Sequence, residues 1–447
     1  MSHAAAAPAP TSTPPVIAPT DARQRVLAPD LVRGSMLLAI ALANAAEILQ
    51  STGAFGHVAG AERLVGVAFY TLVHSRAYPV FAVMFGYGIA QMAARQAALG
   101  TPAAVVRRLL VRRHLWLIAF GFAHAALLYH GDFLAAYGIA GLLATWLLVP
   151  RGPRGLSRVG WLWALMAVEV AVLAGMVVWQ AAGDAGQAAV FAPPPVPAAI
   201  TAESYAASAR ARLQFWPAHT ARVVPFVVIV WAGLWAGRLR LLDEPRRHRR
   251  VLAAAACGGL AITWAGGLPM GLLTAGWLQA GEATAGVVAY LHQVSGMFGG
   301  PGYAAAGGLA AGWITSRPAW RRGFAVEMVA ALGQRSLSGY LFQSAAWLAL
   351  LAPFGLAWGR GSARPLLAAL AVACAVWTVS LAASWWLARA GRRGPAESLL
   401  RRLVYGPGRG VGPSAARIPA PGPGARPLPG GTPDRQPPDP RRQGRAT

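Results

Sequence analysis

Long apolar runs follow one another along the chain and are separated by short polar segments. A bilayer core of about 30 Å needs about 20 apolar residues in one helix, because backbone N–H and C=O groups must pair within the segment where water is absent. We therefore predict an all-α fold, a polytopic transmembrane helix bundle of about ten spans. The runs cover residues 31–50, 64–92, 114–129, 133–149, 159–181, 218–237, 251–273, 284–315, 336–353 and 365–388.

Two of these runs, 64–92 and 284–315, are too long for one straight helix perpendicular to the membrane. The first contains Pro79, and the second contains the string Gly299-Gly300-Pro301-Gly302. We expect both to be kinked or broken. A proline kink is one explanation, and a break that lines a site is the other, since non-helical backbone at membrane depth must be satisfied by protein or by water.

The runs define one membrane domain, residues 25–405, whose C-terminal half begins at about residue 220. Residues 1–24 are rich in Ala and Pro and lack the basic and apolar regions of a cleavable signal, so the first run is expected to direct insertion. Residues 406–447 are mostly Pro, Gly and Arg and are predicted to be disordered, as are residues 1–24. A short amphipathic helix is predicted from Thr201 to Phe215.

Arginine is distributed very unevenly between the predicted loops. All 40 basic residues are Arg, and the net charge is +25. The loops 93–113, 150–158, 238–250, 316–335 and 389–402 carry 23 Arg, whereas the alternate loops carry 4. By the positive-inside rule, this predicts a multi-pass protein of the bacterial inner membrane with both termini in the cytoplasm. The charge indicates contact with acidic lipid headgroups rather than with nucleic acid.

The sequence itself indicates no cofactor and no metal. Cys257 and Cys374 lie in separate apolar runs, where a thiol behaves as a small hydrophobe. Phosphate-binding loops, zinc spacings, haem-attachment pairs and nucleophile elbows are absent from the sequence. Short glycine strings are interpreted as helix-packing positions.

Polar side chains inside the apolar runs are the candidates for function, because they usually face a bundle interior or a wet cavity. Arg33, Asn44 and Glu47 lie on one face of the first predicted helix. Others gather toward the predicted outer leaflet. These are His74, Arg76, His124, Asp132, Tyr137 and His292, with Tyr340 and Gln343 in the ninth run. For each of them the alternative is a hydrogen bond that only packs two helices together.

His124 and Asp132 form the clearest chemical pair in this set. They are eight positions apart across the end of a span, so the two side chains can come within reach of each other. A carboxylate beside a histidine can orient the ring as a general base. His74, in the second run, is a further candidate for that role.

Several of these residues belong to motifs that resemble the bacterial YeiB-like family, the domain of unknown function 418, over about residues 25–405. The motifs are Pro29-Asp30-Leu31-Val32-Arg33-Gly34 with Asn44, Phe81–Gly88, Gly121–His124, Gly131–Tyr137, Gly333–Ser344, and Gly394–Glu397 with Arg401 or Arg402. The family is distantly similar to transmembrane acyltransferases. There, an Arg near the inner end of the first span is followed by a His that serves acyl transfer. This chain has Asn44 where that His is expected, and an amide cannot take a proton as a general base.

The resemblance implies that Arg33 binds a cofactor phosphate, with acyl-CoA as donor, and that His74 or His124 supplies the base. Asp132 would orient His124, while Asn44, Arg76, Tyr137, Tyr340 and Gln343 would bind substrate. The acceptor would be a lipid or a glycan at the outer leaflet. The alternatives are a small-molecule transporter or permease and a non-enzymatic membrane scaffold. The sequence leaves open whether the protein is an enzyme and which oligomer it forms.

Overall fold

The computed structural model describes residues 26–50, 60–184, 197–317 and 323–406, and every regular element within these ranges is a helix. The predicted all-α class is confirmed. The segments predicted to be disordered, 1–24 and 406–447, lie outside the described residues except for Gly406.

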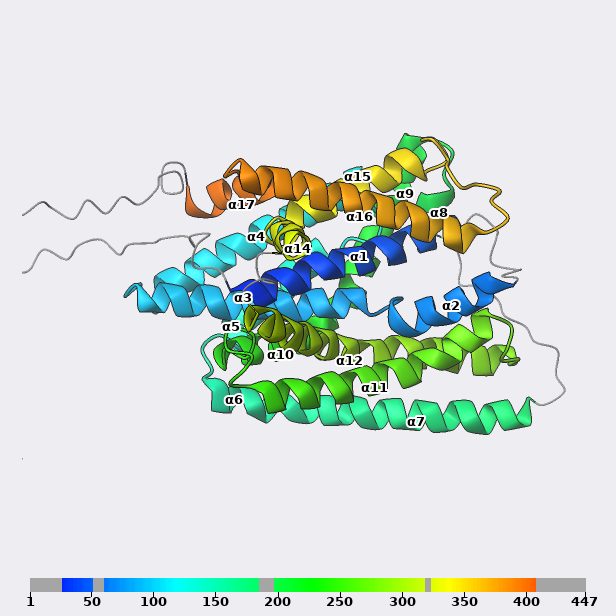
Figure 1. Cartoon of the computed structure of the whole chain (residues 1–447), viewed down its shortest axis with the longest axis horizontal. Coiled ribbons are helices and arrows are strands. Elements are labelled where there is room, and N and C mark those ends of the chain that lie inside the picture. The colour runs from blue at the N-terminus through cyan, green and yellow to red at the C-terminus, as the bar shows by residue number, and fades with distance from the viewer. Residues whose placement is uncertain (1–25, 51–59, 185–196, 318–322, 407–447) are drawn as a thin grey trace, which may run out of the picture. The chain divides into compact units, whose positions relative to one another are not determined.

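Most of the helices run along the long direction of Figure 1 and pack side by side. In chain order they are α1 (Leu27–Gln50), α2 (Ala61–Leu72), α3 (Ala77–Ala98), α4 (Ala103–Leu127), α5 (Leu134–Leu147), α6 (Pro153–Ser157), η3 (Arg158–Gly160), α7 (Trp161–Gly183), α8 (Ala198–Thr201), α9 (Tyr205–Val223), η4 (Val224–Phe226), α10 (Val227–Arg238), α11 (Arg249–Thr274), α12 (Glu282–Thr315), α14 (Phe324–Gln334), α15 (Ser336–Leu350), α16 (Pro365–Arg389) and α17 (Pro395–Tyr405).

Six helical stretches of the described chain are long and apolar enough to cross a bilayer, which is the composition of a membrane protein. They are Leu27–Leu49, Ala61–Ala98, Pro153–Gly183, Tyr205–Arg238, Arg249–Thr274 and Pro365–Arg389. The prediction of about ten spans is not confirmed. The other four predicted runs are helical and fall in α4, α5, α12 and α15, but α5 and α15 have only 14 and 15 residues.

The two ends of the bundle carry different elements. Figure 1 shows α6 and α17 at one end and α2 and α8 at the other. We call the first the basic end, because the Arg-rich segments around α6 and α17 lie there, together with Arg33 and Arg113 of the cavity described below.

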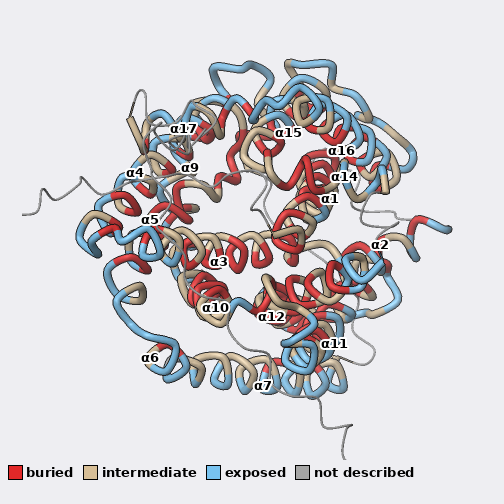
Figure 2. Tube along the Cα trace, turned by 60° about the vertical axis from the view of Figure 1, so that its left-hand side comes forward, coloured by how far each residue is buried: buried red, intermediate tan, exposed pale blue. Residues whose placement is uncertain are grey.

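Close contacts between small residues bring the central helices together. A Cβ on Gly86 of α3 would collide with the Val230 carbonyl of α10, and one on Gly233 of α10 would collide with the Val83 carbonyl of α3. Such positions let helix backbones approach within a membrane. Figure 2 accordingly shows α3, α10 and α12 largely buried, whereas α7 lies at the edge with much of its surface exposed.

The second predicted run is broken, and the break lies before Pro79. Helix α2 ends at Leu72 and α3 begins at Ala77, with Ser75 at φ 61° between them. The buried guanidinium of Arg76 donates to the carbonyls of His74 (2.6 Å) and Thr263 (2.9 Å). Protein groups therefore satisfy backbone that the break leaves without helical partners.

The other long run, 284–315, is one continuous helix, so of the two expected alternatives it is not broken. Helix α12 continues for 34 residues through Pro301. Two glycines of α12 pack closely against the α2–α3 break. A Cβ on Gly296 would lie 2.6 Å from the Ser75 carbonyl, and one on Gly300 would lie 2.9 Å from the Pro79 carbonyl.

The amphipathic helix predicted from Thr201 to Phe215 is also longer than expected. Helix α9 begins at Tyr205, where the Ser204 hydroxyl accepts from the Ala207 N–H (3.2 Å) and caps the helix. It continues through η4 into α10, so this segment is continuous with one of the six helical stretches that are long and apolar enough to cross a bilayer.

Candidate functional site

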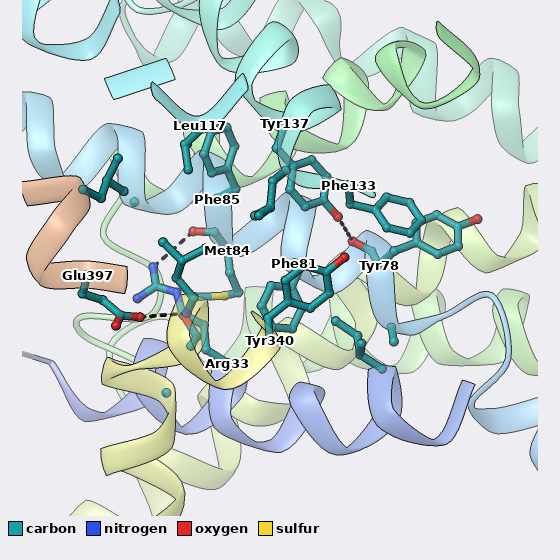
Figure 3. A pocket seen from close by; sticks show the side chains of 18 of the residues that line it. Arg33, Tyr78, Phe81, Met84, Phe85, Leu117, Phe133, Tyr137, Tyr340 and Glu397 are labelled. Atoms are coloured by element: carbon teal, nitrogen blue, oxygen red, sulfur yellow. Dashed lines mark hydrogen bonds between the residues drawn. The ribbon is translucent and has the colours of Figure 1, made fainter. Parts of the chain in front are cut away.

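A cavity of about 330 Å³ lies inside the bundle, between α1, α3, α4, α5, α15 and α17. Figure 3 shows it from close by. Polar and aromatic groups mark its two ends. The polar and aromatic lining residues are Arg33, Asn44, Ser75, Tyr78, Phe81, Phe85, Arg113, Phe133, Tyr137, Gln334, Ser336, Tyr340 and Glu397.

Helix α1 provides one wall along the length of the cavity. Arg33 and Asn44 both line it, and they are eleven residues apart. Eleven residues make about three full turns and about 16 Å of rise, so the two side chains project from the same face. The polar face predicted for the first span is therefore the face that lines the cavity at Arg33 and Asn44.

Two guanidinium groups line the cavity near the basic end. Nη2 of Arg33 donates to the Met84 carbonyl (3.3 Å), and Nη1 lies 3.6 Å from the Asp30 carboxylate. Gly88 leaves room for this side chain, since a Cβ there would be 3.3 Å from Nη2. Arg113 of α4 adds the second positive charge, within electrostatic range of Arg33.

Arg113 was not singled out from the sequence, because it resembles the other arginines of a predicted loop. Its Cζ lies 5.3 Å from the centre of the Phe85 ring, a cation–π contact. Its Nη1 atom is buried and makes no hydrogen bond within the described residues. A buried N–H without a partner costs free energy, which a bound acceptor would recover.

Glu397 of α17 closes the cavity at the basic end by binding the start of α15. Its carboxylate accepts from the N–H groups of Leu337 (2.8 Å) and Ser338 (3.1 Å), and also from the Ser338 hydroxyl. These N–H groups are among those that a helix leaves unpaired at its first turn. A carboxylate there both pairs them and complements the helix dipole.

Aromatic residues close the opposite end of the cavity. Tyr137 donates to the Tyr78 carbonyl (2.7 Å), and the Tyr78 ring stacks against Phe133 at 5.3 Å. The buried Tyr340 hydroxyl makes no hydrogen bond within the described residues. This end therefore presents three tyrosine side chains and the Asn44 amide on an apolar wall.

His124 and Asp132 lie behind that wall and are not among the described residues that line the cavity. The structure brings them together, with Nδ1 of His124 2.9 Å from Oδ1 of Asp132. The other ring nitrogen, Nε2, lies 2.9 Å from the Ser344 hydroxyl. Ser344 belongs to the Gly333–Ser344 motif but was not chosen as a candidate, since nothing in the sequence connects it to His124.

Half-buried His74 and buried Arg76 form a separate cluster at the α2–α3 break. His74 Nδ1 lies 2.9 Å from His292 Nε2, and Arg76 Nη1 lies 3.0 Å from the same His292 atom. Ser75, between them in sequence, reaches the main cavity, whereas Arg76 lines a second, mainly apolar cavity of about 330 Å³ beside α1 and α11. The break thus lies between two cavities.

Two further polar residues serve the packing of α1. Gln343 is buried, and its Nε2 donates to the Leu37 carbonyl (3.3 Å). Glu47 accepts from the Tyr129 hydroxyl (2.5 Å) and lies 3.3 Å from His130 Nε2. Neither residue is among those that line the main cavity.

Within the described residues, no group of three or more His, Cys, Asp or Glu side chains is arranged to hold a metal ion. The cavity instead offers two guanidinium groups and the Glu397 carboxylate at one end, and neutral hydrogen-bonding groups at the other. Guanidinium groups can bind an anionic group of an organic ligand.

The fold has the features of a polytopic helical membrane protein. Its apolar helices surround an internal cavity large enough for a small ligand. Residues 236–407 match the model of a family described as protein of unknown function (DUF418). This match confirms the predicted resemblance to that family over these residues, and it does not show the similarity to transmembrane acyltransferases. No curated protein matches the chain.

Proposed function

We propose that the protein is an acyltransferase-like enzyme of the bacterial inner membrane. It binds an acyl-CoA donor from the cytoplasm and passes the acyl group to a lipid or glycan acceptor at the outer leaflet. In this proposal the chain has about ten spans, with the basic end and both termini in the cytoplasm, as the Arg distribution favours.

The pair of cavity arginines is the observation that carries the proposal. Arg33 and Arg113 present like charges to one cavity, and Nη1 of Arg113 is buried without a hydrogen bond within the described residues. Asp30 lies 3.6 Å from Arg33 and partly balances its charge, so a bound anion would mainly stabilise Arg113. Guanidinium groups match phosphate oxygens through paired N–H donors, so the phosphates of a CoA-type donor fit this end.

The rest of the cavity suits an acyl chain and its carbonyl group. Ile40, Met84 and Leu117 line it with apolar atoms. Asn44, about 16 Å along α1 from Arg33, presents an amide that can donate to a carbonyl oxygen. A fixed donor aimed at a carbonyl stabilises the negative charge that develops during acyl transfer, which is a role an amide performs without taking a proton.

Donor-dependent acyl transfer is the direct test. The protein is reconstituted in lipid vesicles with radiolabelled acyl-CoA, and label in lipids and added glycans is measured. Arg33→Ala and Arg113→Ala are each expected to reduce transfer about 10-fold to 100-fold, the value of a charge-assisted hydrogen bond. Arg151→Ala, which removes an exposed Arg near α6, serves as the matched control and should change nothing. Absence of any transfer by the wild type, or full transfer by both cavity variants, would refute the proposal.

The α2–α3 break favours a transporter as the second candidate. Broken helices in transporters line substrate sites, and this break lies between two cavities. Uptake of a solute by the same vesicles in the absence of any acyl donor would support this function, and it would leave the arginine pair to bind the solute.

A further inference from the structure

Ser344, His124 and Asp132 form a hydrogen-bonded chain from three separate elements. Ser344 lies in α15, His124 in the last turn of α4, and Asp132 in the loop before α5. Both links of the chain are 2.9 Å long. All three residues are buried, with 0%, 2% and 0% of their surface exposed.

The chemistry of the groups fixes the direction of these hydrogen bonds. An ionised carboxylate can only accept, so Nδ1 of His124 carries the proton that bonds to Asp132. In the neutral ring Nε2 is then bare and can accept the Ser344 hydroxyl proton at 2.9 Å, while the Tyr340 carbonyl at 3.2 Å is the other acceptor for that proton. This is the arrangement that activates a serine, with a base next to the hydroxyl and an acid that orients the base.

Asp132 is held in place by more than the histidine. Its two oxygens also accept from the N–H groups of Leu134 (3.1 Å) and Ala135 (2.9 Å), at the start of α5. Gly121 of α4 leaves the space for this carboxylate, because a Cβ there would lie 2.5 Å from Oδ2. The ring of His124 is therefore oriented by a carboxylate that does not move freely.

The chain lies directly against the closed end of the main cavity. Leu134, which binds Asp132 through its N–H, lines that cavity, and so does Tyr340, one helical turn before Ser344. The Tyr340 ring lies 4.8 Å from the His124 ring. The Tyr340 hydroxyl makes no hydrogen bond within the described residues, so rotation of this side chain would break none.

We propose that Ser344 is the nucleophile of a two-step acyl transfer, with His124 as its base, Asp132 as the positioning residue and Tyr340 as the gate. This inference rests on the proposed acyl-transfer function. In the first step Ser344 Oγ bonds to the acyl carbon and the carbon–sulfur bond of the donor breaks. His124 takes the hydroxyl proton and delivers it to the leaving thiolate. In the second step an acceptor hydroxyl attacks the ester, its proton passes through His124 to Ser344, and the acyl–Ser344 bond breaks.

A fluorophosphonate with an alkyl chain tests the nucleophile without requiring any transfer activity. Such a probe phosphonylates an activated serine and loses fluoride. The full-length protein in detergent is treated with the probe, and the labelled peptide is identified by mass spectrometry. Label on Ser344 of the wild type is expected. No label on Ser344 in either the wild type or the Tyr340→Ala variant would overturn the inference.

Labelling rates of variants then test the proposed roles of His124 and Tyr340. His124→Ala should slow labelling by about a thousandfold, the contribution of a general base, and Tyr340→Ala should speed it about tenfold by opening the gate. Ser380→Ala is the matched control, because Ser380 is also buried in a helix and donates to a carbonyl one turn earlier. Equal labelling in the His124→Ala variant would overturn the role of His124. Unfolding midpoints show which variants remain folded.

The two proposals fail in different ways. Acyl transfer that persists in the Ser344→Ala variant would overturn the nucleophile while the acyltransferase function stands. Labelling of Ser344 in a protein that transfers no acyl group would overturn the acyltransferase function, and with it the two-step transfer, leaving only the activated serine.

Discussion

Buried polar groups at the two ends of the cavity differ in their hydrogen bonding. At the basic end Arg113 keeps Nη1 buried without a hydrogen bond, beside the second positive charge of Arg33. At the other end, behind the wall, Asp132 accepts from His124 and from two backbone N–H groups. The Arg113 Nη1 atom therefore lacks an acceptor within the described residues, whereas the Asp132 carboxylate is satisfied within the fold.

This difference suggests that the Arg113 guanidinium serves ligand binding, whereas the hydrogen bonds of Asp132 serve the stability of the fold. Removing a member of a satisfied buried network leaves its partners unpaired and costs stability. Removing a charged side chain whose buried N–H group has no hydrogen bond should cost less stability and should mainly reduce ligand affinity. Measurements of stability and of binding on the same variants can therefore test this difference.

The largest effect is expected at Asp132. The Asp132→Ala variant leaves His124 and two backbone N–H groups of α5 without an acceptor, so it should lose about 3–5 kcal/mol of unfolding free energy. Denaturant unfolding in detergent micelles measures this loss. Glu203→Ala, at an exposed acidic position, is the control and should change little. Equal stability of the two variants would mean that the buried network does not support the fold.

The opposite behaviour is expected at Arg113. The Arg113→Ala variant should unfold at the wild-type denaturant concentration or above it, because it removes a buried charge that repels Arg33. Its affinity for coenzyme A, measured by titration calorimetry, should fall by about 1.5–3 kcal/mol, the value of a hydrogen bond to a charged group. Arg113→Lys keeps the charge and should recover part of the affinity. A large loss of stability with unchanged affinity would reverse the contrast.

A smaller effect is expected from filling the space beside Asp132. The Gly121→Ala variant adds a Cβ 2.5 Å from Asp132 Oδ2 and 2.7 Å from the Ala135 Cβ, so α4 and α5 must separate at a cost of about 1–3 kcal/mol. Gly175→Ala in α7 is the matched control, since a Cβ there meets nothing within 4 Å. The unfolding midpoints of the two variants are compared. Equal midpoints would contradict tight packing around the Asp132 carboxylate.

The smallest effect is expected at Asp184, a carboxylate outside the cavity. It accepts from the Thr284 hydroxyl (2.6 Å) and the Gly281 N–H (2.8 Å), and these hydrogen bonds lower its pKa below 3.8. A lowered folded-state pKa contributes stability above pH 3.8 that is lost as the pH falls through the folded-state value. The Asp184→Asn variant should unfold slightly earlier than the wild type at pH 6, and the difference should shrink below pH 3.8. A difference that stays constant with pH would rule out this titration.

The helical class and the face of α1 were accessible from the sequence because both follow from spacing. Apolar runs of span length determine the first, and the eleven-residue interval from Arg33 to Asn44 determines the second. The number of spans does not follow from spacing alone, since α5 and α15 are shorter than a bilayer core requires.

Pairings between distant segments were not accessible in the same way. Ser344 lies 220 residues from His124, and His292 lies 218 residues from His74, so no local spacing connects either pair. Arg113 was hidden for another reason. Arginines in a basic loop look alike in sequence, and only packing shows which of them turns into the cavity.

The contact between Glu397 and the start of α15 has a consequence for biosynthesis. Leu337 receives its carboxylate partner 60 residues later in the chain, from the last described helix. At ribosomal speeds of about 5–20 residues per second, a segment of that length takes about 3–12 seconds to emerge. For that interval the nascent protein already holds both cavity arginines but lacks the wall at the basic end. The site is therefore assembled last, when the rest of the bundle is already in the membrane.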